Sequence, residues 1–108
     1  MNKQIFVNLP VRDLEKTREF FGSLGYGFNE KYCDHNALCM VVSDDIYVML
    51  LLEKFFATFT NKPVADAKKT SEVLVALSAE SRAAVDETIV KAAAAGGSEP
   101  RPAQDYGW

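Results

Sequence analysis

The 108-residue sequence is poor in the residues that build metal centres and disulfide scaffolds. It contains one histidine and two cysteines, too few for a structural zinc site with four histidine or cysteine ligands or for a cross-linked secreted fold. Its longest strictly apolar run, Ile46 to Leu52, has seven residues, whereas a membrane-spanning helix needs about 18 or more. We therefore expect neither a membrane span nor a disulfide framework, and we interpret the cysteines as reduced thiols.

Positive charge is also scarce. Twelve lysines and arginines oppose fifteen aspartates and glutamates, which gives a net charge of -3 and a pI near 5.1. No basic stripe is present that could neutralise a run of phosphates, so nucleic acid and anionic membranes are poor partners. The apolar stretch ahead of Arg12 and Asp13 is too short for a signal peptide, so we expect a cytoplasmic protein.

The sequence has enough apolar material for one core. Hydrophobic residues make up 48% of the chain and charged residues 25%, proportions that are typical of a globular protein. At this length the chain forms a single domain, residues 1–108, with no room for a separate regulatory domain.

The first half has the pattern of a strand followed by a helix and three more strands. Gln4 to Val11 alternates apolar residues with period two, which predicts a strand. Asp13 is in place to cap an amphipathic helix that begins at Leu14, and Gly25 is in place to end it. The further strands are expected at Tyr26 to Tyr32, Ala37 to Val42 and Ile46 to Leu52, joined by short turns that imply antiparallel hairpins.

The second half repeats the beginning of the first. QIFVNLPV at Gln4 to Val11 aligns without gaps onto EVLVALSA at Glu72 to Ala79, a shift of 68 positions. A second helix is predicted over Ser81 to Ala95, ended by Gly96-Gly97. The segment from Ser98 to Trp108 has room for at most one edge strand, because it contains two prolines.

These patterns divide the domain into a first module (1–53), a connector (54–71) and a partial second module (72–108). The first module needs roughly 49 residues, so a full second copy would extend beyond residue 108. We expect the native product to continue for about 15 to 30 residues that close the sheet, or else a partner to cover an exposed strand edge.

The order of these motifs resembles the vicinal oxygen chelate superfamily, which includes glyoxalase I, bleomycin-resistance proteins and extradiol dioxygenases. The matching segments are Val11-Arg12-Asp13-Leu14, Phe20 to Tyr26 and Ala92 to Gly97. The resemblance implies an α+β fold in which two βαβββ modules form a curved mixed sheet around a cleft, with the second module incomplete at its C-terminus. It also implies a homodimer.

The resemblance also indicates where metal ligands would lie. In the metal-binding members these are histidines on the first strand of each module and a glutamate on the fourth strand. The corresponding positions here are Phe6, Leu74 and Met49, none of which can replace the imidazole or carboxylate donors that a hard or borderline divalent ion needs. We therefore expect no metal and no other cofactor, and an apolar cleft lined by Phe6, Met49 and Leu74.

Four further residues are candidates for this cleft. Asn8 shares the strand face of Phe6 and could orient a ligand through its amide. Leu51 is in phase with Met49. Glu53 follows in the same phase and is a weak catalytic candidate at the rim, the alternative being an exposed carboxylate at a strand end. Phe55 belongs to an aromatic group, with Phe56 and Phe59, that forms either a mobile lid or ordinary core packing.

Two other groups of polar residues have simpler interpretations. Cys33, His35 and Cys39 could supply three zinc ligands, but their spacing fits no standard zinc signature, and a turn flanked by strand cysteines explains them as well. Asp44 and Asp45 are adjacent carboxylates in a turn context, where their side chains diverge.

The sequence thus favours a protein that binds a small organic molecule in an apolar cleft without a divalent metal. The alternative is a metal-dependent lyase or dioxygenase of the same superfamily, whose missing ligands come from further C-terminal residues or a partner chain. A third hypothesis is that the fold supplies only a dimerisation surface. No residue specifies the ligand.

Overall fold

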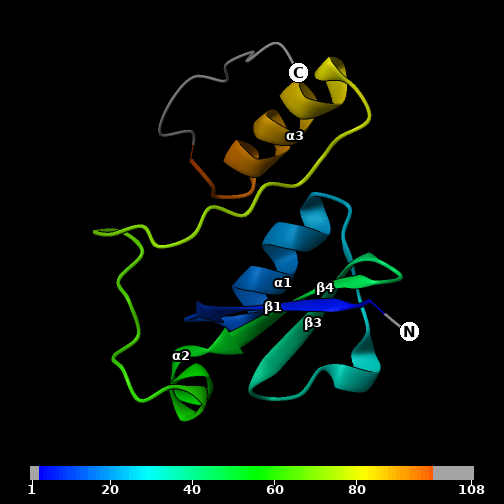
Figure 1. Ribbon diagram of the computed structural model, residues 1–108. Coiled ribbons are helices and arrows are strands. Elements are labelled where there is room, and N and C mark those ends of the chain that lie inside the picture. The colour runs from blue at the N-terminus through cyan, green and yellow to red at the C-terminus, as the bar shows by residue number, and fades with distance from the viewer. Residues whose placement is uncertain (1–2, 99–108) are drawn as a thin grey trace.

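A computed structural model describes residues 3–98. It contains one four-stranded sheet with strand order β1-β4-β3-β2, in which β1 is parallel to β4 and the other pairs are antiparallel (Figure 1). The elements in chain order are β1 Ile5–Val11, α1 Leu14–Ser23, β2 Gly27–Phe28, the 3-10 turn η1 Glu30–Tyr32, β3 Ala37–Ser43, β4 Ile46–Leu52, α2 Glu53–Phe56, the 3-10 turn η2 Ala57–Phe59 and α3 Arg82–Ala94.

One face of the sheet packs against α1 and forms the core. Leu38 and Met40 of β3 and Val48 and Leu50 of β4 make up its buried cluster. Alternate residues of β1 and one side of α1 cover this cluster: Val7, Leu9, Val11, Leu14 and Phe21. Successive residues of a strand point to opposite faces of the sheet. The residues that alternate with these core residues in β1, β3 and β4 therefore lie on the other face, which we call the distal face.

The predicted ends of α1 are confirmed. The Asp13 side chain accepts a hydrogen bond from the Lys16 backbone amide at 3.1 Å, as an N-cap residue does. After the helix Gly25 has a φ of 98°, a left-handed conformation in which a Cβ atom would be strained. The helix therefore begins and ends where its capping residues allow.

The predicted strand from Tyr26 to Tyr32 is much shorter in the structure. Only Gly27 and Phe28 pair with β3. The Asn29 side chain then accepts from the Lys31 amide at 3.1 Å and opens η1. Within this turn the backbone groups form local hydrogen bonds, whereas in a longer strand they would have bonded to β3.

An ion pair holds η1 against α1. Arg18 donates from both Nη atoms to the two Glu30 carboxylate oxygens, at 2.6 and 3.0 Å. These hydrogen bonds lower the pKa of Glu30 and raise that of Arg18. Arg18 also lies 5.0 Å from the centre of the Phe28 ring, so one side chain ties together α1, β2 and η1.

The second half keeps its helix but not its predicted strand. Ser81 caps α3 by accepting from the Ala84 amide, and Gly96 follows the helix with a φ of 103°. The structure assigns no strand to residues 72–79, and all eight are exposed. An apolar alternation forms a strand only when another strand pairs with it, and no sheet partner adjoins this segment within residues 3–98.

The fold class is therefore α+β with a mixed sheet, as expected, and the paired two-module sheet remains a prediction. Figure 1 shows α1 lying between the sheet and α3. Most of the predicted C-terminal strand lies outside the described residues. Within the described residues no helix is long and apolar enough to cross a membrane.

We expect Leu50→Ala to destabilise the protein strongly, because Leu50 is 1% exposed in the core cluster. Removal of its buried methyl groups should cost about 2–5 kcal/mol. Leu74→Ala is the matched control, since Leu74 is 89% exposed and its truncation should change stability by about 0.5 kcal/mol or less. Urea unfolding of both variants measures this difference, and equal costs would contradict the assigned core.

Candidate functional site

The distal face carries three cross-strand rows of side chains. Pairing of β1, β4 and β3 in register aligns Phe6 with Tyr47 and Val41, Asn8 with Met49 and Cys39, and Pro10 with Leu51 and Ala37. The first row begins with an aromatic stack: the rings of Phe6 and Tyr47 are 4.9 Å apart and inclined by 11°. The structure thus places four of the predicted site residues, Phe6, Asn8, Met49 and Leu51, on one face.

A hollow of about 380 Å³ opens on this face beside α2 and η2. The hollow is lined by residues of β1, of β4 and of the segment that follows β4: Asn8, Leu51, Phe56, Phe59 and Thr60. Leu51 is buried, whereas Phe59 is 70% exposed. The volume lies at the small end of the range for organic ligands. We call this hollow the distal pocket.

Two polar groups line the distal pocket. Asn8 donates one Nδ2 hydrogen bond, at 3.3 Å, to the carbonyl of Phe6. Thr60 accepts a hydrogen bond from the Lys62 amide at 3.2 Å through its Oγ1 atom. Within residues 3–98 no hydrogen bond is made by the Asn8 carbonyl oxygen, the second Asn8 Nδ2 proton or the Thr60 hydroxyl proton. Both residues are exposed, so one acceptor and two donors face solvent and are available to a ligand.

The aromatic segment after β4 is helical, with α2 followed directly by η2. Phe56 and Phe59 line the distal pocket, and Phe55 meets Phe59 edge to face at 5.1 Å. Phe55 therefore supports a wall of the pocket rather than lining it. The aromatic residues thus pack together beside the hollow, and the mobile lid remains a prediction.

Glu53 has a defined partner in the structure. It is the first residue of α2, and its Oε1 atom accepts from the Arg12 Nε atom at 3.2 Å. Both residues lie one position beyond the paired ends of β1 and β4. This partly exposed ion pair joins the two strand ends, while the catalytic role of Glu53 remains a prediction.

The structure does not bring Leu74 to the other candidates. It lies in the exposed segment before α3, with 89% of its surface accessible. Its predicted place beside Phe6 requires the second module to pair with the first, which the described residues do not do.

The two cysteines form hydrogen bonds with the backbone. The Cys33 thiol donates to the Asn29 carbonyl, and the Cys39 amide donates to the Cys33 sulfur, both at 3.3 Å. Burial raises the pKa of the Cys39 thiol, and nearby Cys33 raises it further. His35 is exposed and contacts Asn36. Among residues 3–98 no three His, Cys, Asp or Glu side chains gather closely enough to hold a metal ion.

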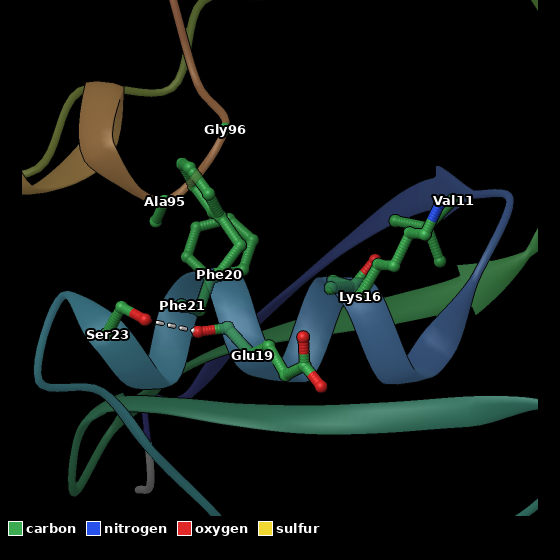
Figure 2. Close-up of a pocket in the computed structure, with 9 residues that line it drawn as sticks. Val11, Lys16, Glu19, Phe20, Phe21, Ser23, Ala95 and Gly96 are labelled. Carbon is green, nitrogen blue, oxygen red and sulfur yellow. Dashed lines mark hydrogen bonds between the residues drawn. The ribbon is translucent and has the colours of Figure 1, made fainter.

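Sequence reasoning missed a second hollow, of about 530 Å³, between α1 and the end of α3. Figure 2 shows Phe20 reaching from α1 towards Ala95 and Gly96. A Cβ atom added at Gly97 would lie 3.0 Å from the Phe20 ring and 2.9 Å from the Ala92 carbonyl oxygen, so glycine allows this close approach. The pattern of either helix alone could not reveal a hollow that depends on how the two helices meet.

Comparison with known proteins agrees with this architecture. Residues 3–43 match the family model described as bleomycin resistance protein-like N-terminal. A hypothetical protein from S. aureus has a similar structure, with a TM-score of 0.73 and 25% identity over 89% of this chain and 71% of that one. No curated protein has significant similarity to the chain.

A second solved structure is also similar, a glyoxalase/bleomycin resistance protein/dioxygenase family enzyme from Burkholderia phytofirmans PsJN. The TM-score is 0.63 and the identity 15%, over 89% of this chain and 74% of that one. Together with the mixed sheet, these matches define a protein of the glyoxalase-like fold. The matches support a relationship between this chain and the glyoxalase and bleomycin-resistance proteins of the vicinal oxygen chelate superfamily.

We expect the two thiols to differ in reactivity. Cys33 is partly exposed, whereas Cys39 is fully buried with a raised pKa. Since the thiolate is the nucleophile, an alkylating reagent at pH 8 should modify Cys33 at least about tenfold faster. Mass spectrometry of timed iodoacetamide reactions measures both rates. The Cys33→Ser variant should then resist modification until it is unfolded, and rapid labelling of that variant would contradict the structure.

Proposed function

We propose that the protein binds a small organic molecule in the distal pocket without a divalent metal. The observation that carries the proposal is the convergence of an amide, a hydroxyl and two aromatic rings on one hollow of ligand size. Sites for small molecules are characteristically apolar hollows with a few polar groups that fix orientation.

The chemistry of the superfamily's ligand positions supports binding without a metal. Phe6 and Met49 lie on the distal face near Asn8, and Phe6 stacks on Tyr47. An aromatic ring and a thioether are poor ligands for the hard or borderline ions that histidine and glutamate hold. The alternative, a metal-dependent lyase or dioxygenase, requires ligands from outside residues 3–98.

We also propose that the protein forms a homodimer. Among residues 3–98, β1 is an edge strand of the sheet, and its Ile5 and Phe6 side chains are 53% and 47% exposed. Val73 and Leu74, in the segment that repeats the β1 sequence, are exposed as well. An apolar strand edge and an unpaired strand-like segment favour association with a second copy.

The binding proposal is tested with N-phenyl-1-naphthylamine, an uncharged dye whose fluorescence rises in apolar sites. We expect saturable binding that EDTA does not change. Phe59→Ala should weaken binding at least about fivefold, because it removes one aromatic wall of the pocket. Tyr32→Ala is the control, since Tyr32 is an exposed aromatic residue that does not line the pocket.

Two outcomes would overturn the binding proposal. Equal weakening by both variants would show that the dye binds elsewhere. Stoichiometric nickel, zinc or iron in the purified protein, with loss of binding after its removal, would instead favour the metal-dependent enzyme.

The dimer proposal predicts a solution mass of twice the 12.0 kDa of one chain. Ile5→Lys should shift the protein towards monomer, because a charge on an edge strand opposes pairing. Val90→Lys adds the same charge on α3, where Val90 is 68% exposed, and should leave the mass unchanged. Light scattering coupled to gel filtration measures all three proteins, and a monomer at every concentration of the unmodified protein would contradict the proposal.

A further inference from the structure

The segment at residues 72–79 has unpaired backbone groups and uncovered apolar side chains within the described part of the chain. All eight residues are exposed, and Val73 and Leu74 are 62% and 89% exposed. Its amides and carbonyls form no hydrogen bond with each other or with the rest of residues 3–98. We call this stretch the repeat segment. An apolar, alternating stretch with free backbone groups is suited to pair with the edge of a sheet.

The outer edge of β1 offers a complementary surface. β1 is the last strand on its side of the sheet among residues 3–98, so its outward amides and carbonyls have no strand beside them. The side chains of Ile5 and Phe6 are about half exposed at this edge. An extended segment added here would form main-chain hydrogen bonds and cover apolar side chains at the same time.

The repeat segment of the same chain cannot lie along this edge. Only Glu80 and Ser81 separate it from α3, and α3 lies on the outer side of α1, away from the sheet (Figure 1). Two residues span about 7 Å, whereas α1 with its side chains is about 10 Å thick. While α3 keeps this place, Ala79 stays on the outer side of α1, and the β1 edge is open to a second copy.

Charges at the strand ends favour pairing of β1 with the repeat segment. β1 is flanked by Lys3 and Arg12, nine positions apart, whereas Glu72 and Glu80 mark the ends of the repeat segment, eight positions apart. Opposite charges therefore meet at both ends in a parallel or an antiparallel pair, whereas two β1 edges would place cation beside cation. Within residues 3–98 Lys3, Glu72 and Glu80 form no ion pair, and Arg12 uses only its Nε atom to bind Glu53.

A reciprocal exchange also buries the area that a stable dimer needs. A specific interface buries about 800 Å² per partner over about 20–30 residues. β1 has seven residues and the repeat segment eight, so an exchange engages fifteen residues of each copy. At the same area per residue this is about 500 Å² per copy and about 1,000 Å² in total, the lower bound for a specific interface. Two β1 edges alone would bury about half as much.

We propose that two copies exchange their repeat segments, each of which adds a strand to the β1 edge of the other copy. This inference rests on the proposed homodimer and identifies the surfaces that form it. In the sequence repeat Leu74 corresponds to Phe6, and Val75 corresponds to Val7, which faces the core. With the same alternation, Leu74 of the second copy joins the distal face beside Phe6. Each distal face then contains residues from both chains.

Hydrogen exchange followed by mass spectrometry tests this proposal on the full chain. Amides of residues 72–79 should exchange at least about tenfold more slowly at a concentration that gives the dimer mass than after dilution to monomer, because strand pairing protects amides from solvent. Amides of residues 60–70, in the loop before the repeat segment, serve as the internal control. Their exchange should change by about twofold or less.

Reversing the charges of the repeat segment tests its partner while leaving its apolar side chains in place. Glu72→Lys with Glu80→Lys should raise the dissociation constant of the dimer at least about tenfold, since attraction at both ends becomes repulsion. Adding Lys3→Glu should recover at least about threefold, because one end regains opposite charge. Glu15→Lys with Glu19→Lys makes the same charge change at exposed positions of α1. This control should change the dissociation constant by about twofold or less.

The outcomes separate the strand exchange from the homodimer. A dimer whose residues 72–79 exchange as fast as in the monomer would overturn the strand exchange and leave the homodimer in place. Equal weakening of the dimer by the two double variants would do the same. A protein that stays monomeric at every concentration would overturn both proposals, and protection of residues 72–79 in that monomer would show pairing within one chain.

Discussion

The parallel pairing of β1 with β4 is the constraint on which the rest of the structure depends. It aligns Ile5 with Ile46 at one end and Val11 with Leu52 at the other. A shift of one residue would exchange the two faces of β1, exposing Val7 and Leu9 and directing Asn8 into the core. The same register places Asn8 beside Met49 and brings the strand ends together, where Arg12 meets Glu53. Core and candidate site are therefore consequences of one alignment.

The position of the distal pocket follows from the way the chain leaves β4. Leu52 is both the last strand residue and the N-cap of α2, so the helix begins without an intervening loop. This abrupt turn keeps Phe56 and Phe59 within reach of Leu51 and Asn8. A longer connection would have allowed the aromatic residues to pack elsewhere. The pocket thus joins residues that are distant in sequence through one strand pairing and one tight turn.

The sequence predicted the elements whose signals are local, including β1, α1, β3 and β4. Their periodicity and capping residues act within a few positions, as Asp13 and Gly25 show for α1. It also predicted that Phe6, Asn8, Met49 and Leu51 would share a face, because strand alternation determines this. It could not predict Thr60 as a pocket wall, nor decide between a lid and core packing for Phe59, since the positions of both residues depend on the turn after β4. For residues 72–79 the sequence predicted a strand that the structure does not contain. Their apolar alternation is strong, but a strand requires a partner backbone.

The side chains on the distal face determine which ligands this part of the fold could hold. Strand pairing places Phe6 and Met49 on the distal face, and the resemblance to the superfamily implies that metal-binding members have ligands at these two positions. Phe6 stacks on Tyr47, and neither Phe6 nor Met49 offers the imidazole or carboxylate donors that a hard or borderline ion prefers. A single substitution to histidine would therefore leave the rest of the coordination shell missing. Under the proposed function, a ligand on this face would be held by apolar contact and by the few amide and hydroxyl groups beside it.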